Sequence, residues 1–187
     1  MLEIAGEHDY RVWRALGLIL QGVTLAGLGS PAEGLARTEQ GIALYEGIRT
    51  PPIFWALVLG LRAEACALAG RTAEAVGLVD QAAALAGERN WLSAGFRIQK
   101  GDLLRSMGDM PGAETSFLAA LHEAEGLGAG MFRLKAATRL AAMAGEAGRE
   151  EAAATLRAAL ETFTEGFDAP DLLDARAVLS EANGHVS

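Results

Sequence analysis

Residues 100–120 read KGDLLRSMGDMPGAETSFLAA and contain small residues at fixed intervals. The intervals are seven, five and seven residues, and they join Gly101, Gly108, Ala113 and Ala120. A glycine between two apolar segments can end a helix, because only glycine adopts the left-handed conformation without steric cost. Small residues on both sides of such a turn let two helix backbones approach closely. The stretch therefore predicts an antiparallel helical hairpin.

The same frame of small residues occurs at three other places in the chain. Its members are Gly22, Gly29, Gly34 and Gly41 in the first copy, Ala63, Gly70, Ala75 and Ala82 in the second, and Ala141, Gly148, Ala153 and Leu160 in the fourth. Successive copies are 41, 38 and 40 residues apart. Each copy also has an aromatic residue near its front: Trp13, Trp55, Trp91 and Phe132. We interpret these aromatic residues as core fillers, with an aromatic binding stripe as the alternative.

Start and stop signals place two helices in every copy. Ser30-Pro31-Ala32-Glu33 has the composition of a capping box, and Asp109 is a weaker start signal. The frame glycines Gly29, Gly70, Gly108 and Gly148 are expected to end helices in the left-handed conformation. The predicted helices are about 8–28, 31–48, 52–69, 72–88, 91–107, 110–127, 130–147, 149–164 and 170–182.

Short connections make neighbouring helices antiparallel. The fold class expected is all-α, an α-solenoid of four helical hairpins plus a C-terminal capping helix. The hairpins are expected at about 8–48, 51–88, 90–127 and 130–164, with the capping helix at about 169–182, in a single domain over 1–187. Alanine and leucine supply 65 residues against 13 for valine and isoleucine, which also favours helix over strand.

Charge and hydropathy exclude several classes of protein. A net charge of −8 argues against a nucleic-acid-binding surface. The first ten residues contain no lysine or arginine, unlike a secretory leader. The most apolar run, residues 53–61, is about half as long as a membrane span. We therefore expect a cytoplasmic protein that binds neither nucleic acid nor membrane.

The frame resembles the tetratricopeptide repeat (TPR), which has small residues at these places and a bulky residue four positions after the third. Phe117 and Val79 supply the bulky residue in the third and second copies. The first copy is degenerate, with Thr38 at that place, and the fourth has Arg157 there. The period exceeds the usual TPR length, which predicts longer helices. It also overlaps the period of HEAT-type repeats.

A second resemblance covers essentially the whole chain. Glu7-His8-Asp9 followed by Trp13, Lys100-Gly101-Asp102-Leu103-Leu104, and FTEGFDAPDL at 163–172 carry it. These stretches are similar to the helical C-terminal region of large bacterial signalling proteins. Such proteins join a class III adenylate/guanylate cyclase or a transcription-regulator domain to an ATPase module and a TPR tail. The resemblance implies a non-catalytic interaction or regulatory region of a larger protein.

No catalytic constellation is evident in the sequence. The histidines His8, His122 and His185 lie far apart, and none has a His or Cys partner at metal-ligand spacing. We expect them on the surface. Cys66 is predicted to be a small buried hydrophobe. The sequence therefore predicts no catalytic residue, no metal site and no cofactor.

The TPR resemblance implies that the first helix of each hairpin lines a partner-binding groove. The residues that it places there are Glu64, Ile98, Gln99, Asp102, Arg105, Lys135, Thr138 and Arg139. Three of them would form a shared basic patch for an acidic peptide: Arg105, Lys135 and Arg139. The expected partner is a protein or peptide, with a small-ligand sensory module that regulates a nucleotide cyclase or ATPase as the alternative. A merely solvated charged face is equally compatible with the sequence.

The first predicted helix is apolar around nearly its whole circumference. Such a helix expects burial on both sides. Either a preceding repeat in a larger protein covers it, or two copies of the chain associate through it as a homodimer. The self-association surface predicted from this pattern consists of Leu16, Ile19 and Val23.

Overall fold

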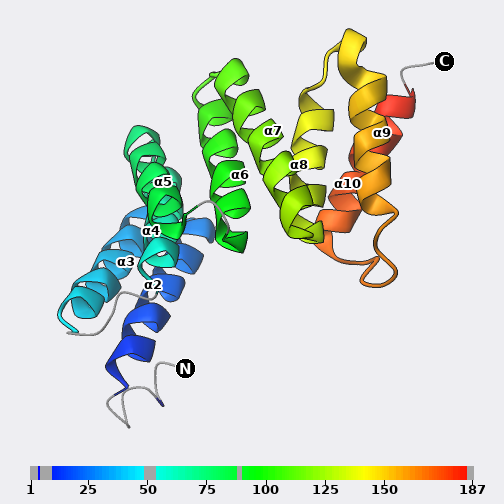
Figure 1. The fold of residues 1–187 in the computed structure, drawn as a ribbon. Helices are drawn as coiled ribbons and strands as arrows, with labels where there is room; N and C mark the ends of the chain where they lie inside the picture. The colour runs from blue at the N-terminus through cyan, green and yellow to red at the C-terminus, as the bar shows by residue number, and fades with distance from the viewer. Residues whose placement is uncertain (1–3, 5–9, 49–53, 88–89, 185–187) are drawn as a thin grey trace. The chain divides into compact units, whose positions relative to one another are not determined.

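The computed structural model describes residues 4, 10–48, 54–87 and 90–184, and all regular structure in that part is helical. The chain divides into two compact units, Met1–Gly87 and Glu88–Ser187. Each unit contains two helical hairpins (Figure 1). The boundary falls at the junction of the second and third predicted repeats. The expectation of one continuous domain over 1–187 stays a prediction.

Unit 1 consists of two hairpins. Its helices are α2 (Arg11–Gly27), α3 (Pro31–Glu46), α4 (Trp55–Leu68) and α5 (Thr72–Ala86). Helix α4 packs against α5 and also against both helices of the first hairpin. The turns contain Gly29 at φ 96° and Gly70 at φ 78°, as the sequence predicts for these two glycines.

Unit 2 has two hairpins and a closing helix. Its elements are α6 (Trp91–Ser106), α7 (Met110–Leu127), α8 (Gly130–Met143), the short 3₁₀ helix η1 (Glu146–Gly148), α9 (Arg149–Leu160) and α10 (Pro170–Gly184). Helix α10 packs on α8 and α9, and Leu172 and Ala175 lie in the core that it shares with them. This helix therefore closes the apolar side of the last hairpin, as a capping helix should.

The predicted fold class, an all-α array of helical hairpins, is confirmed. Most helix bounds agree with the prediction within a few residues, but the fourth hairpin differs. Helix α8 ends at Met143 because Ala144 is extended, with φ −64° and ψ 125°. Gly148 has φ −107° and belongs to η1, so the left-handed stop predicted there is wrong. Helix α9 ends at Leu160, earlier than the predicted residue 164.

Helix capping also departs from the sequence pattern. Ser30 occupies the N-cap of α3, but its side chain makes no capping hydrogen bond, so the capping box is wrong. The weaker start signal, Asp109, does cap its helix: the Asp109 carboxylate accepts a hydrogen bond from the Gly112 N–H at 3.0 Å. Asn90 caps α6 in the same way through the Leu92 N–H at 3.0 Å. The predicted start of the helix at 52–69 lies outside the described residues.

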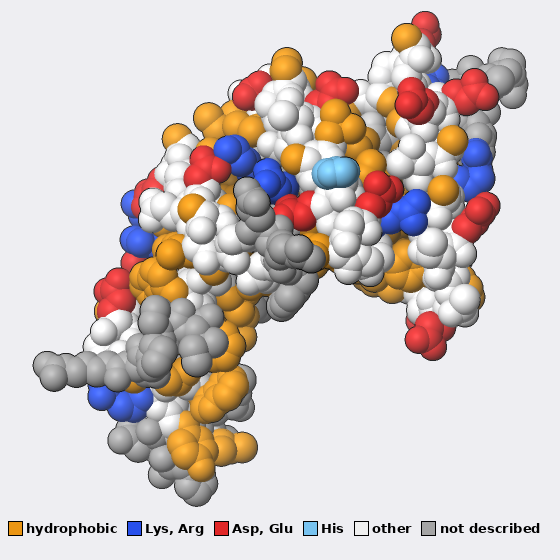
Figure 2. Space-filling model, in the orientation of Figure 1, with side chains coloured by type: hydrophobic (Ala, Val, Ile, Leu, Met, Phe, Trp, Pro, Cys, Tyr) orange, Lys and Arg blue, Asp and Glu red, His pale blue; other side chains and the backbone are white. Residues whose placement is uncertain are grey.

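The core of unit 1 contains most of the predicted self-association surface. Ile19 is fully buried and Leu16 is 7% exposed, while Val23 is half-buried. Helix α2 contacts α3 and α4, which cover the side of α2 that carries Leu16 and Ile19. The assignment of Leu16 and Ile19 to an exposed surface is therefore wrong. The exposed apolar side chains of α2 include Trp13 and Leu20, and Figure 2 shows hydrophobic side chains gathered in that region.

The four aromatic residues at the front of the repeats do not share one environment. Trp55 is half-buried and stacks on Tyr45, with ring centroids 5.9 Å apart. Phe132 is also half-buried, whereas Trp13 is about half exposed. The core-filler prediction therefore fails for Trp13. Its ring centroid lies 6.4 Å from that of Phe54. The side chain of Trp91 lies outside what the structure describes.

Candidate partner-binding face

The residues predicted to line the groove divide between the two units. Glu64 lies on α4 of unit 1. The others lie on α6 (Ile98, Gln99, Asp102 and Arg105) and on α8 (Lys135, Thr138 and Arg139) of unit 2. Helices α6 and α8 are the first helices of their hairpins and contact each other. The predicted groove residues of unit 2 therefore lie on two helices that pack side by side.

Asp102 lies at the centre of the charged side chains of α6 and α8. Its carboxylate pairs with Arg105 one turn further along α6, at 3.3 Å. It also accepts hydrogen bonds from Arg139 of α8, with Nε–Oδ2 and Nη2–Oδ2 distances of 3.3 Å. Two nitrogens of the Arg139 guanidinium thus approach the same carboxylate. Asp102 therefore joins the two helices across their exposed side.

A second ion pair extends the face to α10. Lys135 Nζ lies 3.3 Å from Asp171 Oδ2, in the first turn of that helix. The residues of the ion pairs just described form what we call the charged strip: Asp102, Arg105, Lys135, Arg139 and Asp171. Their side chains are 28–42% exposed. Ion pairs this exposed contribute only about 0–1 kcal/mol each to stability, so a partner can compete for the same groups.

The charged strip corrects the expected basic patch. Arg105, Lys135 and Arg139 each have a carboxylate within 3.3 Å, so they do not form an unneutralised cluster. Asp171, which the sequence reasoning missed, supplies one of these carboxylates. Acidic residues in the first turn of a helix are common because the helix dipole favours them, so the sequence gave no separate signal for Asp171. The strip keeps an excess of one positive charge on a chain whose net charge is −8.

Two of the predicted groove residues lie in the core instead. Ile98 is 6% exposed and belongs to a cluster with Ala113, Phe117 and Ala136. Thr138 is 7% exposed, and its hydroxyl donates to the Leu134 carbonyl at 2.8 Å. Both side chains lie on sides of α6 and α8 that neighbouring helices cover. Neither can contact a partner, and their assignment to the groove is wrong.

The remaining predicted residues differ in their surroundings. Gln99 is half-buried on α6, next to the charged strip in sequence. Glu64 belongs to unit 1 and makes no ion pair within the part of the chain that the structure describes. Glu64 is exposed on α4, but neighbouring atoms remove part of the water around its carboxylate and raise its pKa above the ordinary value of 4.5, because desolvation disfavours the charged form.

Sequence reasoning missed a groove on another side of unit 2. An open hollow of about 670 Å³ lies between α7 and α9, and the end of α8 and η1 also line it. It exists because α8 stops at Met143, four residues before its predicted end. The only sequence signal was the pair Gly145 and Gly148, which we assigned to the interior and the end of a helix. We call this hollow the α7–α9 groove.

The sequence offered Cys66 and three histidines as candidates for chemistry. Cys66 is buried, as predicted, and burial raises the pKa of its thiol. His122 is exposed, as expected, whereas His8 and His185 lie outside the described residues. Over residues 10–48, 54–87 and 90–184, no group of three or more His, Cys, Asp or Glu side chains could hold a metal ion. No helix in the same ranges is long and apolar enough to cross a membrane.

Solved structures resemble the chain over nearly its whole length. BtubC (BKLC) from P. vanneervenii matches with a TM-score of 0.72 and 16% identity, over 98% of this chain and 85% of that chain. The fold is TPR-like. The TPR-like repeats of a candidate kinesin light chain from Podosopora anserina match with a TM-score of 0.67 and 18% identity, over 92% of this chain and 88% of that chain. A single-substitution variant of those repeats gives a TM-score of 0.69 and 18% identity, with coverages of 94% and 89%.

At these identities the likeness shows the fold alone. No family model and no curated protein matches the chain. The TPR-like fold agrees with the small-residue frame, because the frame residues Ala75, Ala82, Ala113 and Ala120 are all fully buried at helix contacts. It also agrees with the placement of α6 and α8 as neighbouring first helices of their hairpins.

Proposed function

We propose that the chain is a non-catalytic scaffold that binds a protein or peptide through the charged strip of unit 2. The observation that carries this proposal is the Asp102–Arg139 contact between α6 and α8. It links charged side chains of α6 and α8, the first helices of two neighbouring TPR-like hairpins. Prearranged side chains lose less entropy when they bind.

The composition of the strip selects the class of partner. Three cations and two carboxylates leave an excess positive charge, and Arg105 is the most exposed member, at 42%. A peptide carboxylate can therefore pair with Arg105 and Lys135 while Asp102 and Asp171 remain close to their present cations. An extended acidic peptide fits this pattern better than a basic one. The affinity of such a complex falls as salt screens the pairs.

Fluorescence anisotropy with a labelled, glutamate-rich peptide tests the proposal. We expect saturable binding at low salt that weakens in Arg105→Glu/Lys135→Glu by about tenfold, or about 1.4 kcal/mol. The matched control is Arg149→Glu/Arg157→Glu on α9, which makes the same change in net charge outside the strip. Because its two sites lie at opposite ends of α9, their effects on the helix dipole oppose each other.

The control separates a site from general attraction. Loss of binding in the strip variant alone supports the charged strip as the docking face. Equal loss in both variants would mean that the peptide responds only to net charge, and the proposal would be wrong. Circular dichroism of both variants checks that the helices are intact.

We also propose that the chain is the C-terminal interaction or regulatory region of a larger cytoplasmic bacterial signalling protein. The segment at 163–172, which carries the most specific part of this resemblance, forms a defined turn between α9 and α10. Gly166 has φ 68°, and Arg176 donates to the Phe167 carbonyl at 3.1 Å while its guanidinium lies 5.3 Å from the Phe167 ring centroid. Sequencing the full transcript tests this context. A cyclase, ATPase or regulator domain in the same reading frame is expected, and a complete frame without one would contradict it.

A further inference from the structure

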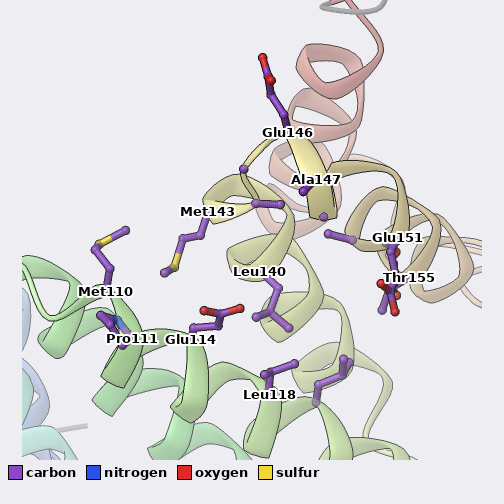
Figure 3. Close-up of a pocket in the computed structure, with 15 residues that line it drawn as sticks. Met110, Pro111, Glu114, Leu118, Leu140, Met143, Glu146, Ala147, Glu151 and Thr155 are labelled. Atoms are coloured by element: carbon purple, nitrogen blue, oxygen red, sulfur yellow. Dashed lines mark hydrogen bonds between the residues drawn. The ribbon is translucent and has the colours of Figure 1, made fainter.

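The α7–α9 groove has a floor and two walls that come from different helices. Figure 3 shows Met110, Pro111 and Glu114 on the α7 side, Glu151 and Thr155 on the α9 side, and Leu140 of α8 between them. Along their described residues, no Cα of α7 lies within 8 Å of a Cα of α9, although Leu121 of α7 packs against the core cluster that contains Leu156 of α9. The space between them is therefore open to a segment that could lie against both.

The groove exposes large apolar side chains. Leu118 is 52% exposed and Met110 is 44% exposed, while Leu140 and Met143 are half-buried. These side chains give the groove an apolar lining that a partner could cover. The two methionines are flexible and polarizable, so they can adjust to an apolar partner of variable shape. These properties suit an apolar helix face better than a single rigid ligand.

The charged residues that line the groove are all acidic. Glu114 lies on the α7 wall, Glu151 lies on the α9 wall, and Glu146 stands at the edge. None of the residues that line the groove is Lys, Arg or His. Across residues 90–184, none of the three carboxylates forms an ion pair with a cation of the chain. An apolar floor between two acidic walls complements a segment that is apolar on one face and cationic on both flanks.

We propose that the α7–α9 groove binds a cationic amphipathic helix from a partner protein. Apolar residues at i, i+3 or i+4, and i+7 of the partner contact Leu118, Leu140 and Met143. Lysine or arginine residues that flank this apolar stripe pair with Glu114 and Glu151. This site differs from the charged strip both in position and in charge, because the strip lies on α6, α8 and α10 and favours an acidic partner. The two proposals can therefore fail separately.

Titration with a synthetic probe tests the groove. The probe is a labelled amphipathic helix of about 18 residues with leucine on one face and lysine on the other. A peptide with glutamate in place of lysine serves as the charge control. We expect saturable binding of the lysine peptide to the full chain, and about tenfold weaker binding to Glu114→Lys/Glu151→Lys.

The matched protein control is Glu161→Lys/Glu165→Lys. Both residues are exposed carboxylates of unit 2 outside the groove, and the change in net charge is the same. A third variant, Leu118→Ser, keeps the net charge and reduces only the apolar contact, with an expected loss of about fivefold. Hydrogen exchange of the complex should show protection in residues 110–118 and 149–155.

Three outcomes would overturn the proposal. The first is equal weakening in the two charge-reversal pairs, which would mean that the acidic chain attracts the peptide without a site. The second is unchanged binding to Leu118→Ser together with protection elsewhere in the chain. The third is equal affinity for the lysine and glutamate peptides. Loss of binding confined to the groove variants, with protection on α7 and α9, supports the proposal.

Discussion

The first hairpin of unit 1 and the first hairpin of unit 2 carry the same frame but pack in different ways. Between α2 and α3 the backbones themselves touch, because a Cβ on Gly34 would lie 2.5 Å from both Ala26 N and the Gly22 carbonyl oxygen. Between α6 and α7, a Cβ on Gly101 would instead meet the Phe117 ring, 2.7 Å from Cδ1. Glycine thus makes room for a backbone in one hairpin and for an aromatic side chain in the other.

This difference explains why the first repeat looked degenerate. Phe117 and Thr38 occupy the same place in the frame, and both are fully buried. A phenylalanine at position 38 would not fit between helices that approach so closely, whereas Thr38 fits and its hydroxyl donates to the Gly34 carbonyl at 3.0 Å. Glycine in place of alanine in the first repeat therefore accompanies a smaller residue at the bulky position. Departures from a repeat motif can compensate for one another in volume.

The largest effect is expected from Phe117→Ala. Removing a fully buried ring from the core of unit 2 should lower the free energy of unfolding by about 3–5 kcal/mol. Thr38→Ala, at the equivalent place in unit 1, should cost only about 1 kcal/mol because little volume and one hydrogen bond are lost. Native-state hydrogen exchange can report the stability of α6–α7 and α2–α3 separately. Equal losses in the two hairpins would remove the distinction drawn between them.

The next effect concerns Ala113, the frame residue that lies beside Phe117. Ala113→Leu should destabilise the α6–α7 hairpin by about 1–3 kcal/mol through overpacking, since Ala113 is fully buried. Ala154→Leu on the exposed side of α9 is the control and should change stability little. Thermal melts of both variants provide the measurement. An unchanged melt for Ala113→Leu would show that the repeat register is wrong.

A smaller net effect is expected from Gly34→Ala in the first hairpin. The added methyl group forces α2 and α3 apart at a cost of about 1–3 kcal/mol, which about 1 kcal/mol of improved helix propensity partly offsets. Gly77→Ala in α5 is the control, because a Cβ there meets nothing within 4 Å. The control should stabilise the chain by about 0.4–1 kcal/mol. Urea denaturation that gives both variants the same sign of change would contradict the backbone contact.

The smallest effects concern two carboxylates on first helices of hairpins, Glu64 on α4 of unit 1 and Asp102 on α6 of unit 2. Asp102 has two arginine partners, whereas burial raises the pKa of Glu64 above 4.5. The stabilising contribution of Glu64 is therefore fully present below pH 4.5 and is lost as the pH rises through its folded-state pKa. Because Glu64 is exposed, solvent screens most of this effect, so Glu64→Gln should be only slightly more stable than the parent at neutral pH and equal to it below pH 4.5.

Asp102→Asn is expected to act in the opposite direction at neutral pH. It removes the ionised partner of both arginines, so it should destabilise unit 2 slightly, by about 1 kcal/mol or less, and less at high salt. Denaturation midpoints at acidic and neutral pH provide the comparison. The same sign for both variants at pH 7 would show that the two faces do not differ in this way.

Local features of the sequence predicted much of the architecture. The spacing of Gly101, Gly108 and Ala113 predicted a hairpin because helix ends depend on residues close in sequence. The glycine turns at Gly29, Gly70 and Gly108 are confirmed. The sequence also predicted correctly that Asp102, Arg105, Lys135 and Arg139 belong to neighbouring first helices, since a repeat brings equivalent positions together.

Only the tertiary structure decided which sides of those helices are covered. Leu16 and Ile98 were assigned to exposed faces, but both are buried because neighbouring helices pack on those sides. Asp171 joins the charged strip because α10 packs on α8, which no local pattern indicates. The α7–α9 groove depends on where α8 stops and on the separation between the backbones of α7 and α9. A residue's exposure depends on neighbours that are distant in sequence, so the helices and turns could be predicted locally and the binding surfaces could not.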